Sequence, residues 1–236
     1  MSGTVWPKTF PPLTPEQEQM RDAFMHAWHE ELPKKYGIIE KFNHGYVVEH
    51  APAQFRNTLE IGAGLGEHLA YEKLTPEQRA EYVCVELRAS MAAEIQRAHP
   101  GVQAIVGDCQ QRLDFPDDHF DRVLAVHVLE HLPNLPAAVR EMYRLCNKQH
   151  GRFQVVIPCE GGLAYSLARR ISAQRFFEAR WDMPYKLVIE REHMNVPREI
   201  LEILDEHFTI ENRSYFPLRV PSVELNLVIG LTLRPR

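Results

Sequence analysis

The chain has 236 residues, of which 44% are hydrophobic, and its formal net charge is -5. This length and composition predict one globular domain with elaborations. The acidic balance gives no general attraction to nucleic acid, so we expect no nucleic-acid partner. No apolar run resembles a signal sequence or reaches the length of a membrane helix, which predicts a cytoplasmic protein without membrane insertion. Four widely spaced cysteines are expected to be reduced and structural.

Residues 1–50 are predicted to form a helical cap or lid segment. Thr14, Pro15 and Gln17 form the pattern of a capped helix start, and apolar residues follow at helical spacing. The later part of the segment carries polar and aromatic side chains. These side chains either close over a bound cofactor or pack into the core, and the sequence pattern fits both alternatives. They are Tyr36, Phe42, Asn43, His44 and Tyr46.

Residues 51–236 are predicted to form the main domain, because short apolar runs alternate with helical patterns there. Helices are expected from Gly66, through Ala98 and at 135–146. After an irregular insertion at about 159–196, one more helix precedes two strands that are close enough to pair antiparallel. Strands are expected at 57–61, 81–87, 102–107, 120–128, 151–158, 208–216 and 224–233.

The segment from Glu60 to Gly66, EIGAGLG, lies where the first strand turns into the following helix. Glycine lets the backbone approach a ligand closely, and the turn lies at the carboxyl edge of a parallel sheet, where ligands bind. A dinucleotide fingerprint that starts at Gly62 requires glycine at position 67, where this chain has Glu67. The carboxylate of Glu60 suits a cationic ligand group, such as the amine of S-adenosylmethionine.

Two further acidic residues follow at the ends of the next two strands. Glu86 can accept hydrogen bonds from both hydroxyls of a ribose. Asp108 can accept from an adenine amino group, and the backbone N–H of Cys109 can meet a ring nitrogen. The spacing therefore suits an adenosyl ligand that lies across the ends of three strands.

The motifs EIGAGLG, VELRAS, GDC and FDRVLAVHVLEHL resemble those of class I S-adenosylmethionine-dependent methyltransferases, of the methyltransferase type 11 kind, over about residues 57–158. The resemblance implies a Rossmann-like, seven-stranded, mostly parallel sheet with an antiparallel C-terminal strand in a three-layer αβα sandwich. It implies S-adenosylmethionine as the cofactor, with its methionine part near Glu60 and its ribose at Glu86. The predicted cofactor-binding set is Glu60, Gly62, Ala63, Gly64, Gly66, Glu86, Leu87, Asp108, Cys109 and His127.

Two histidines are candidate catalytic residues. His127 follows the fourth strand at the carboxyl edge, so it can serve as a general base, although such a histidine can also simply fix a loop. His193 returns toward the same edge as a base or an acceptor contact, or packs in a loop. His127 and His131 have the spacing of a metal pair on one helix, but we place His127 in the strand exit and predict no metal.

The insertion at about 159–196 is predicted to set acceptor specificity, because long connections in compact domains often shape sites. Arginines with interleaved aromatics can hold an anionic acceptor group. The alternative is an amphipathic helix with a solvated basic face. The predicted substrate-binding residues are Tyr165, Arg169, Arg170, Arg175 and Arg180.

These observations predict a methyltransferase that acts on oxygen or nitrogen of a small-molecule acceptor, such as a metabolite, a glycan precursor or a lipid-linked intermediate. Methylation of RNA or protein, and cofactor binding without catalysis, are the alternatives. The chain is expected to be a monomer or a homodimer.

Overall fold

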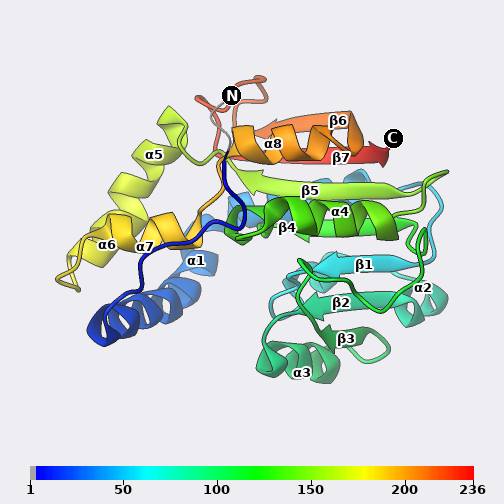
Figure 1. The fold of residues 1–236 in the computed structure, drawn as a ribbon, viewed down its shortest axis with the longest axis horizontal. Helices are drawn as coiled ribbons and strands as arrows, with labels where there is room; N and C mark the ends of the chain where they lie inside the picture. Colours follow the sequence, from blue (N-terminus) through cyan, green and yellow to red (C-terminus); the bar gives the residue numbers. More distant parts are fainter. Residues whose placement is uncertain (1–3) are drawn as a thin grey trace.

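The computed structural model describes residues 4–236, with side chains described at all of these positions except 28–36. Seven strands form one sheet in the order β3-β2-β1-β4-β5-β7-β6 (Figure 1). Strands β1 to β5 pair in parallel, and β7 is antiparallel to both β5 and β6. This confirms the predicted Rossmann-like sheet. The strands are β1 (Thr58–Ile61), β2 (Tyr82–Glu86), β3 (Gln103–Val106), β4 (Arg122–Val126), β5 (Arg152–Pro158), β6 (Phe208–Phe216) and β7 (Val228–Pro235).

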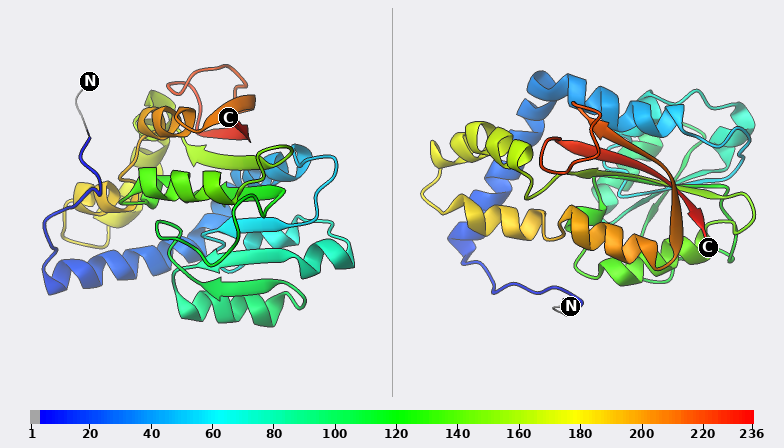
Figure 2. Two further views of the ribbon diagram at one scale, coloured as in Figure 1. Left: turned by 45° about the vertical axis from the view of Figure 1, so that its right-hand side comes forward. Right: turned by 90° about the horizontal axis from the view of Figure 1, so that it is seen from above.

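Helices cover both faces of the sheet, which gives the three layers (Figure 2). On one face, α4 (Leu135–Leu145) and α8 (Pro197–Asp205) bury apolar side chains in a core shared with every second residue of the strands. On the other face, the end of α1 (Pro15–Glu49) and α3 (Ala89–Ala98) complete a second core. Successive side chains of a strand point to opposite faces of the sheet, so each strand contributes apolar side chains to both cores.

Helix α1 begins as the sequence predicts. Thr14 is its N-cap, and the reciprocal capping box with Gln17 is present. The helix is continuous to Glu49, so the polar and aromatic run from residue 36 onward lies within it. The side chain of Tyr36 lies outside the described side chains. Tyr46 is buried, and its hydroxyl lies 3.1 Å from the side-chain oxygen of Thr232, so the end of α1 is fixed to the sheet.

The helix expected from Gly66 is replaced by a short 3-10 helix, η1 (Glu67–Ala70), and a separate helix, α2 (Pro76–Ala80). Pro76 disfavours helical backbone at Thr75, which instead caps the new helix. Between the two helices, the side chain of Glu72 is drawn inward. It pairs with the fully buried Arg122 at 2.7 Å.

Arg122 also donates to Gln154 Oε1 at 2.8 Å and to the carbonyl oxygen of Val47 at 3.1 Å. The amide of Gln154 donates to the same carbonyl at 2.8 Å. These bonds satisfy a carbonyl near the C-terminal end of α1, where helices leave such groups unpaired. The buried ion pair therefore ties α1 to strands β4 and β5.

The insertion forms α5 (Leu163–Arg169), a π-helical turn η3 (Arg170–Gln174), α6 (Arg175–Glu178) and α7 (Tyr185–Glu192). These helices lie with the first half of α1 beyond the carboxyl ends of the parallel strands (Figure 1). Phe24 of α1 packs edge-on against Phe177 and Tyr185, with ring centroids 5.2 and 5.9 Å away. The two segments thus share a small aromatic core. None of the described helices has the length and apolar character needed to span a membrane.

Candidate active site

The loop after β1 uses left-handed backbone at three glycines. Gly62, Gly64 and Gly66 have φ values of 60, 61 and 86°, a region that favours glycine. A Cβ atom on Gly62 would lie 2.6 Å from Cγ2 of Val128. The loop therefore needs glycine both for its conformation and for its close approach to the segment that follows β4.

Glu86, at the end of β2, closes against this loop. Its Oε1 accepts a hydrogen bond from the Gly64 N–H at 2.7 Å, and its Oε2 accepts from the Leu87 N–H at 2.9 Å. A carboxylate offers about four lone-pair sites, so two sites remain for ligand hydroxyls. The Leu87 side chain is exposed and Ala63 is buried.

Asp108 follows β3, and its Oδ1 accepts from the backbone N–H and the side-chain amide of Gln110 at 2.9 and 3.0 Å. Its second oxygen has no hydrogen-bond donor among the described residues and can accept from a ligand. Burial and the neighbouring Asp108 carboxylate raise the pKa of the Cys109 thiol to about 12. This thiol stays protonated and is not a nucleophile.

Glu60 lies in the layer between the sheet and α1. It is 3% exposed, and its Oε2 accepts a hydrogen bond from the Tyr82 hydroxyl at 2.7 Å. Burial raises the pKa of this carboxyl group, against the lowering effects of His68 and Tyr82. Glu60 therefore bonds to a side chain of β2, whereas Glu86 contacts the glycine loop directly.

His127 leaves β4 with a left-handed backbone, at φ 53°. Its Nδ1 lies 3.0 Å from Oε1 of Glu130, which is fully buried. Burial alone raises the pKa of Glu130, but the hydrogen bond from His127 and the nearby His131 and His193 hold it at about 2. An ionised carboxylate only accepts, so Nδ1 carries the proton. The other nitrogen of His127, Nε2, is then left as an acceptor.

A second histidine–carboxylate pair faces the first. Nδ1 of His193 lies 3.0 Å from Oε2 of Glu160, whose other oxygen pairs with Arg169. Burial raises the pKa of Glu160, but the hydrogen bond from His193 and the charge of Arg169 hold it below its usual range. The ring of Tyr165 lies 6.4 Å from that of His193. Asn195 fixes this segment by donating to the carbonyl oxygens of Leu129 and Leu132.

The remaining predicted substrate-binding residues do not reach this cluster. Arg170, Arg175 and Arg180 are exposed on the insertion. Arg180 lies 3.7 Å above the ring of Phe176 and donates to that residue's carbonyl oxygen. Tyr165 and Arg169 thus lie near the histidines, whereas Arg170, Arg175 and Arg180 are exposed to solvent.

Three further residues at this edge, Glu130, Glu160 and Asn195, were not predicted as site residues from the sequence. His44 of α1 lies at the same edge, stacked on Tyr71 with ring centroids 4.7 Å apart. Burial, with nearby His68 and His127, lowers the pKa of His44 to about 3. Burial of these polar groups is the signal that marks them, and it becomes visible only in the folded chain.

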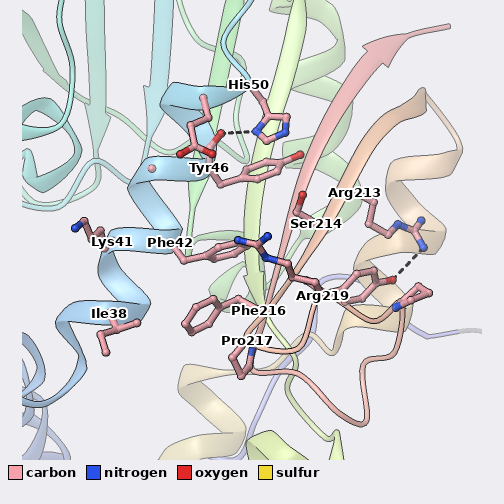
Figure 3. A pocket seen from close by; sticks show the side chains of 14 residues that line it. Ile38, Lys41, Phe42, Tyr46, His50, Arg213, Ser214, Phe216, Pro217 and Arg219 are labelled. Atoms are coloured by element: carbon pink, nitrogen blue, oxygen red, sulfur yellow. Dashed lines mark hydrogen bonds between the residues drawn. The ribbon is translucent and has the colours of Figure 1, made fainter.

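A groove of about 880 Å³ lies elsewhere, between α1 and β6. Phe42, Phe216 and Arg219 line it (Figure 3). Arg213 in its wall is turned toward the hydroxyl of Tyr215, 3.4 Å away. None of its lining residues belongs to the glycine loop or to the histidine pairs, so we assign the active site to the carboxyl edge.

Residues 59–153 match the methyltransferase domain family. A protein from Pyrococcus horikoshii is 17% identical over 85% of this chain and 90% of its own, with a TM-score of 0.61. A TehB-like SAM-dependent methyltransferase from Corynebacterium glutamicum is 15% identical over 93% and 100%, with a TM-score of 0.59. A geranyl diphosphate C-methyltransferase from Streptomyces coelicolor is 12% identical over 95% and 100%, with a TM-score of 0.61.

No curated protein sequence matches the chain significantly. At these identities the solved structures establish the fold alone, whereas the family match covers the strands that carry the glycine loop, Glu86, Asp108 and His127. Residues 59–153 are thus similar to a methyltransferase domain, and this domain implies S-adenosylmethionine as the cofactor.

Proposed function

We propose that the protein transfers the methyl group of S-adenosylmethionine to an oxygen or nitrogen atom of a small-molecule acceptor. The observation that carries this proposal is the pairing of His127 with the buried Glu130 at the carboxyl end of β4. A histidine held this way presents a basic nitrogen to the site. An acceptor hydroxyl group must lose its proton during methyl transfer, and such a nitrogen can accept it.

The described residues fit the cofactor. The left-handed glycines of the loop leave its backbone open to close approach, and the carboxylate of Glu86 keeps lone pairs for two ribose hydroxyls. The free oxygen of Asp108 would receive the adenine amino group. When bound, the cofactor supplies an electrophilic methyl group on sulfur, whose C–S bond breaks with its electron pair passing to sulfur.

The chain's own contribution is alignment and proton removal. We assign to Nε2 of His127 the proton that leaves the acceptor, because Nδ1 is committed to Glu130. Glu130 stays ionised and stabilises the imidazolium that forms, as a carboxylate does behind a histidine base. Tyr165, Arg169 and His193 lie next to this pair and would contact the acceptor, with Arg169 suited to an anionic group.

Calorimetric titration tests cofactor binding first. S-adenosylmethionine and S-adenosylhomocysteine should each bind saturably to the purified chain, and NAD should not. A panel of hydroxylated and aminated small molecules, assayed by formation of S-adenosylhomocysteine, then tests transfer. Binding of NAD alone would contradict the cofactor assignment. Tight cofactor binding with no turnover on any panel member would favour a cofactor-binding protein without transferase activity.

A further inference from the structure

Three potential metal ligands meet beside His127 at the carboxyl edge of the sheet. Glu130, His131 and His193 each offer one ligand atom, and these atoms all lie within 4.8 Å of one another. Nε2 of His131 and Oε1 of Glu130 are 3.9 Å apart. The rings of His131 and His193 meet edge-on, with centroids 5.1 Å apart.

The neighbours of the two histidines prepare them as ligands. Nδ1 of His131 bonds to the carbonyl oxygen of Glu192, which can only accept, so Nδ1 carries the proton. Nδ1 of His193 lies 3.0 Å from Oε2 of Glu160 in the same way. Each neutral ring then keeps its lone pair on Nε2. Metal-binding histidines usually have such carbonyl or carboxylate partners on the opposite nitrogen.

Glu130 has unused acceptor capacity next to this cluster. The residue is fully buried, and its Oε2 has no hydrogen-bond donor among the described residues. A buried carboxylate oxygen without a partner is costly. A cation that the Glu130 carboxylate binds through both of its oxygens would satisfy Oε2 as well.

We propose that Glu130, His131 and His193 bind one divalent transition-metal ion, with Zn²⁺ the best-matched ion. Two imidazoles and one carboxylate form a donor set that suits zinc, whereas Mg²⁺ prefers oxygen ligands. Zinc bonds of about 2.1 Å place tetrahedral ligands about 3.4 Å apart, so the three side chains close inward by small rotations.

Three protein ligands leave an open coordination position toward the site. That position would take an oxygen of the acceptor and make its hydroxyl proton easier to remove. This role in acceptor binding rests on the proposed methyltransferase function, whereas metal binding itself does not.

The test is titration of the metal-stripped full-length chain with Zn²⁺, with Mg²⁺ as a second probe. We expect one Zn²⁺ site per chain and much weaker binding of Mg²⁺. His193→Asn should abolish the site, and Glu160→Gln, which changes the partner of His193 and leaves all three ligands in place, should weaken it about 10- to 100-fold. His150→Asn is the matched control, because His150 is exposed before β5, at the opposite edge of the sheet.

Absence of a stoichiometric Zn²⁺ site, or equal binding by wild type and His193→Asn, would overturn the proposal. Visible absorption of the Co²⁺-loaded chain gives a second readout, since nitrogen ligation in a distorted site changes the spectrum of the ion. S-adenosylhomocysteine titrations on the same samples separate the two proposals. If the chain binds S-adenosylhomocysteine but not zinc, the metal proposal alone fails. If it binds zinc but not S-adenosylhomocysteine, the proposed function alone fails.

Discussion

The two halves of the carboxyl edge are built differently. Around the glycine loop, backbone conformation and local contacts form the site: the loop glycines, the Glu86 carboxylate on the Gly64 N–H, and the turn at Asp108. Around His127, buried side chains form it, and they come from distant segments. Glu160 and His193 are 33 positions apart, and Asn195 reaches back 66 positions to Leu129. In the proposed function, the first half would hold the cofactor with the main chain, and the second would move a proton with side chains.

If this division holds, damage to the second half should reduce turnover and leave cofactor affinity intact. His127→Asn is the sharpest variant, because asparagine tolerates the left-handed backbone of this position and lacks the basic nitrogen. We expect turnover of the best acceptor from the panel to fall by about 10²- to 10⁴-fold, the usual contribution of a general base. Calorimetry with S-adenosylhomocysteine should show a change in affinity of less than about threefold, under about 1 kcal/mol. An equal loss in both measurements would remove the distinction between the halves.

Damage to the first half should have the reverse effect. In Gly62→Ala, the new Cβ would meet Val128 at 2.6 Å in a left-handed backbone that disfavours alanine. We expect affinity for S-adenosylhomocysteine to fall about 100-fold, which corresponds to about 2.7 kcal/mol.

Gly161→Ala is the matched control, because Gly161 has φ 85° but open space around its Cβ position. It should lower the free energy of unfolding by about 1 kcal/mol and leave affinity unchanged. The double variant Gly62→Ala/Val128→Ala should recover part of the lost affinity. If it recovers none, steric contact with Val128 is not the cause.

Glu86→Ala removes the side chain that contacts the loop and that, in the proposed function, would bind the ribose. Hydrogen bonds to charged groups contribute about 1.5–3 kcal/mol, so we expect affinity for S-adenosylhomocysteine to fall about 10- to 100-fold. Glu94→Ala, an exposed acidic residue of α3 that pairs with Arg97, is the control and should bind normally. Unchanged binding in Glu86→Ala would show that this carboxylate does not hold the ribose.

The same division explains what the sequence predicted. The strands, their order and the cofactor half depend on alternating apolar runs, on glycines and on acidic residues at strand ends, all of which are local patterns. His127 was selected because it ends a strand. Its partner Glu130 is not marked by the sequence, because no local pattern shows that it is fully buried.

Other differences between the sequence-based expectations and the structure also have specific causes. The helix expected after Gly66 is short because Glu72 pairs with Arg122, 50 positions away, and Pro76 begins another helix. Glu160 could not be paired with His193 from sequence, because the π-helical turn after α5 and the fold of the insertion decide where it returns to the sheet. Long-range pairing of charged side chains is what the sequence did not reveal.

His44 lies where the halves meet, since His68, Tyr71 and His127 face it from the glycine-loop segment and from the end of β4. Burial lowers its pKa to about 3, so the folded chain keeps the ring neutral while the unfolded chain takes up a proton below about pH 6.5. Stability is therefore present above pH 6.5 and falls as the pH drops from 6.5 toward 3. Between pH 7 and 5 the loss from this residue is about 2 kcal/mol.

His44→Phe keeps an aromatic ring against Tyr71 but cannot titrate, so the free energy of unfolding should depend less on pH between 7 and 5. Urea unfolding at several pH values measures this slope. His207→Phe, which replaces another stacked imidazole at the far side of the sheet against Tyr143, should keep the wild-type slope. If His44→Phe also keeps it, the ring of His44 is protonated in the folded chain and the contact between the two halves is more open to water than its burial implies.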